Sequence, residues 1–314
     1  MPRISDALLN CAVYVYGSLS DARVGERHGG SGLIVNVPVK SSPGSAWPYI
    51  VTNRHVLTKA VNPVVRIDRI DGTAECFETN GSQWIGHPDG DDIVVLPLGF
   101  DHRALRFAGI SIRQFLTKEL VIGEDVGIGD DTFIVGRFIS HDGKQCNSPA
   151  IRFGNIAMMP LEPIACEESG VAQESFLVET RSSPGCSGSA VFLYSPCAMN
   201  DMTVRRLDLD KSGISLHPRE SRETHESLDR KIRAAIGGKG PYLLGIDCCH
   251  LKYKTKVLGG DGQETGNTFS ENTGMAAVIP AWRIAEILDS EELMKIREEM
   301  ENDWLKRSSV VNLD

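Results

Sequence analysis

The sequence predicts an all-β protein made of two β units, with a helix at its C-terminal end. Short segments rich in β-branched and aromatic residues recur along the chain, and clusters of glycine, proline, serine and aspartate separate them. The 314 residues include 31 glycines and 15 prolines without a regular period. Frequent, scattered turn formers favour short strands over a helical bundle. On these grounds each unit could be either a barrel or a sandwich.

The first unit is predicted to span residues 1–105. Its apolar segments are too short and too rich in β-branched residues to be helices. Turn-forming residues, such as those at 29–32 and 88–90, lie between them. The predicted strands are 11–16, 32–37, 49–52, 63–67 and 92–98.

A linker over residues 106–118 and a second unit over residues 119–280 are predicted next. The second unit repeats the pattern of short apolar segments and turns, and a charged, turn-rich insertion at 195–240 interrupts it. Such a stretch is best interpreted as a surface excursion, with one helix expected at 225–236. The predicted strands are 120–122, 132–139, 150–158, 175–179, 190–194 and 242–248.

The last segment, residues 281–314, is predicted to be a helix and a tail. Asp289 and Glu292 have the spacing of a capping box, and apolar residues follow at intervals of three or four. These apolar residues are Leu293, Ile296, Met300 and Trp304. The expected amphipathic helix could dock on the β units or contact a second copy or a partner protein.

Composition excludes several classes of function. The net charge of −9 provides no broad cationic field for nucleic acid or an anionic membrane surface. No apolar run is long enough for a signal peptide or a membrane span, so we expect a cytoplasmic protein that binds neither nucleic acid nor membrane. In that compartment the eight cysteines are expected to be free thiols.

The run Cys248-Cys249-His250 suggests a metal cluster at first sight. Consecutive residues of a strand point to opposite faces, so the three side chains could not easily bind one ion. No second motif with metal-ligand spacing completes a site. We therefore expect no metal.

Three polar residues at predicted strand edges carry the chemistry, in the order His55, Asp92, Ser187. A serine hydroxyl is a poor nucleophile unless a neighbouring imidazole takes its proton during attack. A carboxylate on the other side of the imidazole fixes its tautomer and stabilises the imidazolium. We expect Ser187 to be the nucleophile, His55 the general base and Asp92 its orienting acid. Backbone N–H groups of Gly185 and Ser187 are expected to form the oxyanion hole.

These segments resemble the trypsin-like serine peptidases, especially the Deg (HtrA-like) branch and bacterial proteins with a trypsin-like peptidase domain. The resemblance covers most of the chain, and the serine and histidine motifs are its most specific parts. The matching motifs are Gly30-Ser31-Gly32, Thr52-Asn53-Arg54-His55-Val56, Asp92-Ile93-Val94-Val95-Leu96, Gly185-Cys186-Ser187-Gly188-Ser189, Leu244-Gly245-Ile246 and Gly274-Met275-Ala276-Ala277-Val278-Ile279-Pro280.

The resemblance implies two six-stranded antiparallel Greek-key β-barrels and a C-terminal α-helix. It implies a serine endopeptidase that hydrolyses protein or peptide substrates through an acyl-enzyme intermediate, without cofactor or metal. Substrate would pair with the strand near residues 248–250 by β-augmentation. The substrate pocket would involve Arg181, Cys248, His250, Gly274 and Ala276.

The sequence also departs from the family. Cys186 stands before the nucleophile, where secreted digestive relatives have an aspartate, so zymogen cleavage of that type is not expected. Cys186 is itself the competing nucleophile, but cysteine proteases of this fold place glycine two residues earlier, where Pro184 stands here. A PDZ-like segment after residue 280 is not expected from the sequence. The 195–240 insertion could gate substrate, contact a partner, or be solvated decoration.

Two other functions remain open at this point. The barrels could retain the triad while serving as a binding or sensor module for a partner. The chain could alternatively be a protease of narrow specificity that processes itself.

Overall fold

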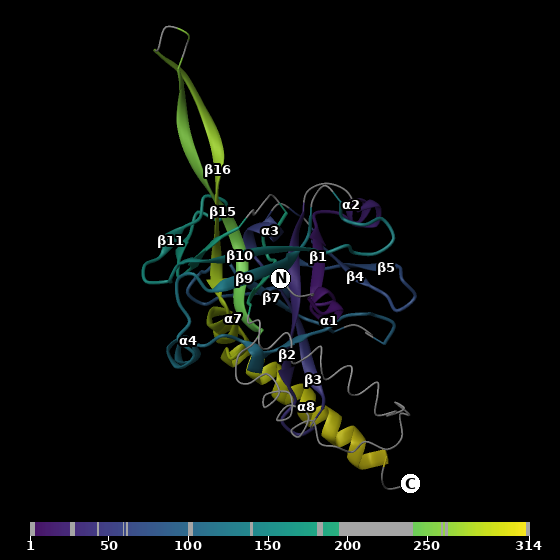
Figure 1. The fold of residues 1–314 in the computed structure, drawn as a ribbon. Helices are drawn as coiled ribbons and strands as arrows, with labels where there is room; N and C mark the ends of the chain where they lie inside the picture. The colour runs from purple at the N-terminus through teal and green to yellow at the C-terminus, as the bar shows by residue number, and fades with distance from the viewer. Residues whose placement is uncertain are drawn as a thin grey trace, which may run out of the picture.

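The structure, a computed structural model, describes residues 4–25, 29–42, 44–58, 60, 62–99, 103–138, 141–180, 185–194, 241–258, 260 and 263–311. The 195–240 insertion, its expected helix and Arg181 lie outside this described part. The chain is mostly β-strand, arranged as two β units with helices at the C-terminal end (Figure 1).

The first unit is an eight-stranded sheet with the order β5-β4-β1-β2-β3-β7-β6, to which β8 adds beside β2. Six of its strands have four or more residues: β1 (Ala12–Tyr16), β2 (Gly29–Pro38), β3 (Ala46–Thr52), β4 (Val64–Asp68), β5 (Ala74–Glu78) and β7 (Val94–Pro97). Two-residue strands complete it: β6 (Ile85–Gly86) and β8 (Ile110–Ser111). All pairs are antiparallel except β2 with β8. The strand β5, which the sequence analysis missed, is only partly buried and lacks the apolar run of its neighbours.

The second unit is a closed barrel of six antiparallel strands, in the order β10-β13-β16-β15-β14-β9. They are β9 (Asp131–Gly136), β10 (Ala150–Met158), β13 (Phe176–Glu179), β14 (Ala190–Leu193), β15 (Tyr242–Leu258) and β16 (Glu264–Pro280). A separate pair, β11 (Ile164–Ala165) and β12 (Ala172–Gln173), flanks the barrel. The all-β fold with two β units is confirmed, and the second unit has the predicted six strands, whereas the first has eight, one of them paired in parallel.

One predicted strand of the second unit is a helix instead. Residues 120–122 lie in α4 (Lys118–Gly123), whose first turn is capped by Thr117. The Thr117 hydroxyl accepts a hydrogen bond from the Leu120 N–H at 3.2 Å. A side-chain cap satisfies an N–H that a helix leaves unpaired, so it outweighs a three-residue apolar run.

The described residues form three larger hydrophobic cores and a small one around Tyr14 and Tyr16. One lies inside the first sheet around Val13, Ile34 and Ile50, and a second fills the barrel around Ile134 and Val191. The largest joins both units and the C-terminal helices, and it includes Leu33, Val51, Phe133, Phe192, Ile246 and Ile284. Because both faces of β2 and β3 are buried, these strands read as continuous apolar runs rather than alternating ones.

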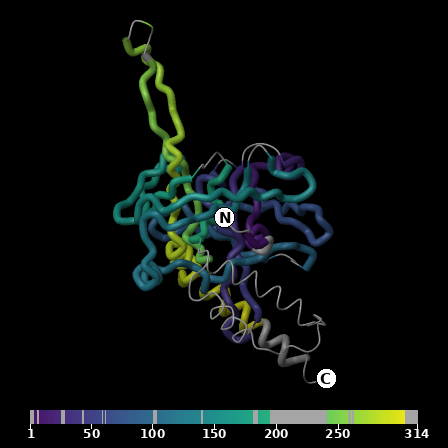
Figure 2. Tube along the Cα trace, viewed as in Figure 1, coloured from purple at the N-terminus to yellow at the C-terminus, as the bar shows by residue number. Residues whose placement is uncertain are grey.

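The strands β15 and β16 form a hairpin that extends far beyond the barrel. Each has 17 residues, and their pairing continues to Leu258↔Glu264. Residues 252–257 and 263–273 are exposed, and we call this outer part the arm. Figures 1 and 2 show the arm projecting from the body. The sequence analysis ended this strand at 248 because the arm is polar and lacks the apolar alternation of a half-buried strand.

The C-terminal segment forms two helices where one was predicted. Helix α7 (Ala281–Leu288) buries Ile284 and Ile287, and α8 (Glu291–Val311) follows after a break at Asp289 and Ser290. The cap of α8 is Ser290, whose hydroxyl accepts from Leu293 N–H at 3.5 Å, rather than Asp289. Helix α8 contacts the β2–β3 hairpin through Arg297, which donates to the Tyr49 hydroxyl at 3.1 Å.

The shorter helices are α1 (Asp6–Leu9), α2 (Leu19–Val24) and α3 (Arg54–Thr58), with the 3-10 turns η1 (Gly81–Gln83) and η2 (Ile112–Gln114). Among the described residues, no helix is both long and apolar enough to cross a membrane.

Candidate active site

His55 and Asp92 form a buried pair at one end of the first sheet. Strands β3 and β7 are antiparallel and pair Thr52 with Val94. His55 follows β3 and Asp92 precedes β7, so both lie at the same end of this strand pair. The Nδ1 atom of His55 lies 2.5 Å from Oδ2 of Asp92, and the two residues are 8% and 2% exposed. This contact fixes the imidazole with Nε2 as its free nitrogen.

Asp92 is anchored on every side. Its Oδ1 accepts from the backbone N–H of His55 at 2.8 Å, and its carbonyl accepts from Asn53 Nδ2 at 3.0 Å. Its own N–H donates to Oε1 of Gln173 at 2.7 Å. Gln173 belongs to β12 of the second unit, so the acid is held by residues from both units. Such a carboxylate has little freedom to move away from the imidazole.

Ser187 lies in a tight loop just before β14. The loop passes through two glycines with left-handed backbone, Gly185 at φ 91° and Gly188 at φ 84°. Any Cβ on Gly188 would meet the carbonyl oxygen of Ser31 at 2.0 Å. Glycine is required at Gly188 both for its dihedral angles and for this close approach.

Ser31 of β2 ties this loop to the first unit. The Ser31 N–H donates to the carbonyl of Ser187 at 2.8 Å, and its hydroxyl donates to the carbonyl of Gly185 at 3.2 Å. The Ser31 hydroxyl also accepts from Arg137 N–H at 2.8 Å, and the Ser31 carbonyl accepts from Thr52 at 2.7 Å. The strand pair that delivers His55 therefore also positions the loop of Ser187.

Cys248 connects the two parts of the site. The Ser187 hydroxyl donates to the Cys248 carbonyl at 3.1 Å, and the Cys248 thiol donates to Oδ2 of Asp92 at 3.3 Å. Within the described residues the Ser187 hydroxyl makes no hydrogen bond to His55. In this arrangement His55, Asp92 and Ser187 gather around one residue of β15, but the serine faces a carbonyl rather than the imidazole.

The two predicted oxyanion donors, the N–H groups of Gly185 and Ser187, are next to the Ser187 hydroxyl in the loop. In the described part of the chain, neither the Gly185 N–H nor the Ser187 N–H has a hydrogen-bond acceptor. Neighbouring amides of the loop are engaged, because Gly188 donates to Asp247 at 2.7 Å and Ser189 donates to Cys186 at 2.8 Å. Unpaired backbone N–H groups beside a hydroxyl can bind an anionic oxygen.

The predicted pocket residues lie in different settings. Cys248 and Ala276 are fully buried, so Cys248 contributes to the site through its carbonyl and its contact with Asp92. His250 is partly buried, and burial lowers the pKa of its imidazole from 6.5. Gly274 has left-handed backbone at φ 79°, and its carbonyl accepts from Thr180 N–H at 2.7 Å.

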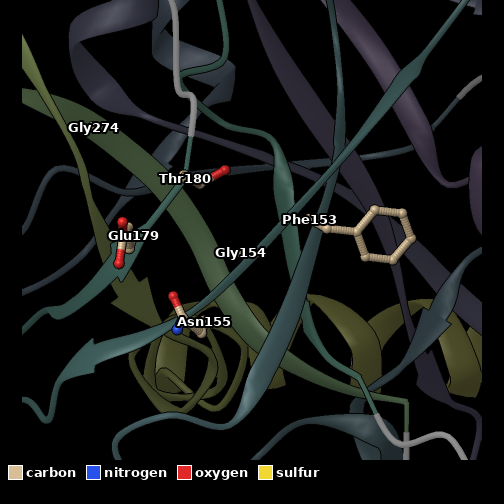
Figure 3. A pocket seen from close by; sticks show the side chains of 6 residues that line it. All are labelled: Phe153, Gly154, Asn155, Glu179, Thr180 and Gly274. Atoms are coloured by element: carbon tan, nitrogen blue, oxygen red, sulfur yellow. The ribbon is translucent and has the colours of Figure 1, made fainter. Parts of the chain in front are cut away.

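An open hollow of about 500 Å³ adjoins this region (Figure 3). It is lined by Phe153, Gly154, Asn155, Glu179, Thr180 and Gly274. Glu179 and Thr180 end the segment that leads to the Ser187 loop, and Gly274 faces them across the β13–β16 pair. The hollow thus shares Gly274 with the predicted pocket. The Glu179 carboxylate is its ionisable group, which the sequence analysis did not consider.

Three buried thiols lie next to one another, and one of them, Cys248, contacts the Asp92 carboxylate. Sulfur atoms of Cys166, Cys248 and Cys249 all lie within 4.8 Å of one another. The expectation that Cys248 and Cys249 point to opposite faces is wrong, because a register shift lies between Asp247 and Cys249. Two residues of β15 there face one step of β16, which is a β-bulge. Hydrogen bonds from the Cys248 and Cys249 thiols lower the pKa of Cys166, while the hydrogen bond with Cys166 raises that of Cys248.

Sequence reasoning missed the residues that support the site. Ser31 is visible in the Gly30-Ser31-Gly32 motif, where a serine between glycines on a buried strand marks a close approach of backbone. Gln173 and Cys166 gave no such signal, because they reach the site from the separate β11–β12 pair.

No protein-family model matches the chain, and no curated protein matches it either. Its structure is similar to the MamO protease domain from Magnetospirillum magneticum in the apo form, with 16% identity and a TM-score of 0.47 over 90% of this chain and 98% of that one. It is also similar to the Rv3671c protease in an inactive form, with 13% identity and a TM-score of 0.44 over 90% and 89%.

A third similar structure is the HtrA-type protease AlgW with a decapeptide, with 15% identity and a TM-score of 0.40 over 83% of this chain and 52% of that one. All three are proteases by name. Identities and TM-scores are low, so the assignment of the fold rests on the strand pairing and the closed barrel described above.

Proposed function

We propose that the chain is a serine endopeptidase with Ser187 as nucleophile, His55 as general base and Asp92 as the orienting acid. The observation that carries the proposal is the buried contact of 2.5 Å between His55 Nδ1 and Asp92 Oδ2 beside a glycine-flanked serine. A carboxylate on Nδ1 leaves Nε2 as the basic nitrogen, which is the tautomer that general-base catalysis needs.

The proposed reaction begins when the Ser187 hydroxyl leaves the Cys248 carbonyl and turns to His55 Nε2. His55 takes the proton as the serine oxygen attacks the peptide carbonyl, and Asp92 stabilises the imidazolium. The unpaired amides of Gly185 and Ser187 would bind the developing oxyanion, where loss of one donor costs roughly 10²–10³ in kcat. His55 then protonates the leaving amine, and water hydrolyses the acyl-enzyme by the reverse sequence of proton transfers.

The substrate class we propose is a protein or peptide. Its backbone would lie along β15 near residues 248–250. The side chain before the cleaved bond would enter the region shared by Gly274 and the hollow of Figure 3. An Arg181 near the base of this pocket would favour an acidic side chain before the cleaved bond. The cytoplasm stays the predicted compartment, and the 195–240 insertion and C-terminal helices stay the predicted partner surfaces.

A serine-directed fluorophosphonate tests the nucleophile. We expect it to label the native chain and to spare Ser187→Ala, because only a serine paired with a base reacts at a useful rate. The matched control is Ser82→Ala, since Ser82 is exposed on η1 and its side chain takes no part in the contacts of the site described above. Equal labelling of Ser187→Ala and the native chain would reject Ser187. Labelling abolished by Cys186→Ala but retained by Ser187→Ala would assign the reaction to Cys186.

One observation favours a second function. The Ser187 hydroxyl is bonded to the Cys248 carbonyl instead of His55, which is the state expected of a barrel that binds peptides without cleaving them. A peptide library incubated with the native chain separates the two. Peptides bound without cleavage, together with no fluorophosphonate adduct, would assign a binding module.

A further inference from the structure

The thiols of Cys166, Cys248 and Cys249 form a cluster that the proposed peptide hydrolysis does not use. The three residues are 2%, 0% and 2% exposed. The sulfur atoms of Cys248 and Cys166 lie 3.6 Å apart, and all three sulfurs lie within 4.8 Å of one another. None of the three is in a disulfide. A lone buried cysteine usually serves only as a small apolar residue. Three mutually adjacent thiols are stronger evidence of a chemical role.

The spacing of the sulfurs suits a bound metal ion. Zinc binds thiolates at about 2.3 Å in tetrahedral geometry, which places two ligand sulfurs roughly 3.8 Å apart. The 3.6 Å between Cys166 and Cys248 is close to this value. A disulfide would need about 2.05 Å between the sulfurs. The other sulfur–sulfur distances are at most 4.8 Å, which exceeds the zinc spacing by no more than about 1 Å.

A β-bulge in β15 brings the three thiols together. Cys248 and Cys249 are consecutive, and a regular strand would send them to opposite faces. The bulge between Asp247 and Cys249 removes this alternation and lets both sulfurs approach Cys166, which follows β11. A bulge is a built feature that redirects a side chain, often next to an active site.

Polar side chains besides Asp92 lie around the cluster. Gln173 donates to the Cys248 sulfur from Nε2 at 3.2 Å, and such a donor can orient a ligand sulfur and stabilise its charge. The Glu168 carboxylate accepts a hydrogen bond from the Cys166 thiol at 3.5 Å, so a carboxylate lies beside one of the three sulfurs. Lys252 pairs with Glu168 at 3.0 Å and balances part of the negative charge.

We propose that Cys166, Cys248 and Cys249 bind a thiophilic divalent cation of the zinc type, with Glu168 or water as the fourth ligand. Each metal–sulfur bond replaces an S–H bond, and the thiol protons pass to solvent. Soft thiolates select zinc over magnesium or calcium, which prefer oxygen ligands. Because Cys248 also donates its proton to Asp92, metal binding removes one donor from the proposed catalytic acid.

Zinc itself is the probe for the test. The full chain, purified with a reductant, is equilibrated with Zn²⁺ against a competing chelator, and the bound metal is measured by elemental analysis. We expect about one zinc per chain in the native protein. Cys249→Ala should weaken zinc binding by more than the roughly 10–100-fold that loss of an outer-shell contact costs. The matched control is Cys76→Ala, since Cys76 lies on β5 outside the cluster and should bind zinc normally.

Two further measurements keep the result interpretable if Cys249→Ala folds poorly. Co²⁺ bound to the native chain should give thiolate charge-transfer absorption, and Zn²⁺ should protect Cys166, Cys248 and Cys249 from alkylation after partial unfolding. A native chain that binds no zinc, or alkylation of these cysteines that zinc leaves unchanged, would overturn the proposal. Zinc binding is measured without substrate, so its failure is distinguishable from failure of the peptidase proposal.

Discussion

The two halves of the candidate site differ in how firmly they are held. Asp92 binds His55 through both carboxylate oxygens, and its backbone is fixed by Asn53 and Gln173. The loop of Ser187 is tied to Ser31 and Asp247, but the Ser187 hydroxyl itself bonds to the Cys248 carbonyl rather than to the imidazole. The base is thus preorganised, whereas the nucleophile needs a rotation of its side chain.

This difference indicates where control of the reaction would act. Electrostatic preorganisation of the base costs nothing at the moment of reaction. The serine must exchange one hydrogen bond for another, so substrate or a partner can favour the active rotamer only by contacts that differ between the two states. Substitutions in the two halves should therefore have separable effects, as the following predictions specify.

Asp92→Asn should have the largest effect. It keeps the shape of the site but favours the wrong imidazole tautomer, so we expect kcat to fall by about 10⁴-fold. Cleavage of a peptide found with the library measures the loss. Circular dichroism controls for folding, and activity within tenfold of the native value would show that Asp92 does not orient His55.

Gly188→Ala should displace the loop that carries Ser187 and leave the His55–Asp92 pair in place. The new Cβ would meet the Ser31 carbonyl at 2.0 Å, and the residue has φ 84°, so the loop must shift. Displacing the Ser187 amide should lower kcat by roughly 10²-fold or more. Gly72→Ala is the control, because Gly72 also has left-handed backbone, at φ 86°, but open space for a Cβ. An unchanged kcat for Gly188→Ala would contradict the described loop.

Ser31→Ala should loosen the nucleophile half more gently. It removes the donor to the Gly185 carbonyl and leaves the Arg137 N–H without its acceptor. An unsatisfied buried group costs about 1–3 kcal/mol of unfolding free energy. Urea unfolding measures this, and Ser31→Thr, which keeps a hydroxyl, tests whether the hydrogen bonds or the residue's size matter. Equal stability of the native chain and Ser31→Ala would remove Ser31 as the tie between the units.

His250→Gln should have the smallest effect, visible only in the pH dependence of stability. Burial lowers the pKa of His250 in the folded state from 6.5, so the folded protein binds fewer protons than the unfolded one. Stability is then fully present above the unfolded pKa and is lost as pH falls through the folded value. The variant should lose less Tm than the native chain between about pH 7.5 and pH 5. Parallel curves would show that His250 is not buried in solution.

Much of this site could be predicted from sequence because local chemistry dictates it. Runs of β-branched residues predict the buried strands. A histidine or an acid that directly follows or precedes such a run is therefore expected at the end of a strand. The glycines around Ser187 signal a loop that no other residue can form. These features depend on neighbours in the sequence.

The parts that could not be predicted depend on distant residues. The bulge at Cys248 changes which way the side chains face without any local marker. The sequence therefore predicts that Cys248, Cys249 and His250 do not share one ion, and it gives no sign that Cys166 lies beside Cys248 and Cys249. Gln173 and Cys166 come from a two-stranded excursion whose position the sequence does not encode. The arm was missed because its exposed residues need no apolar pattern.

The arm of β15 and β16 has a consequence for how this protein can diversify. The arm residues lie outside the barrel and are exposed. Closure of the barrel and packing of the core therefore do not fix the length of the arm. Because side chains alternate with a period of two, insertions or deletions preserve the inner register only when matched partners change together, such as Lys254 with Ser270. We therefore expect homologues to have arms of different lengths, with equal numbers of residues added to or removed from β15 and β16, and the same strand pairing inside the barrel.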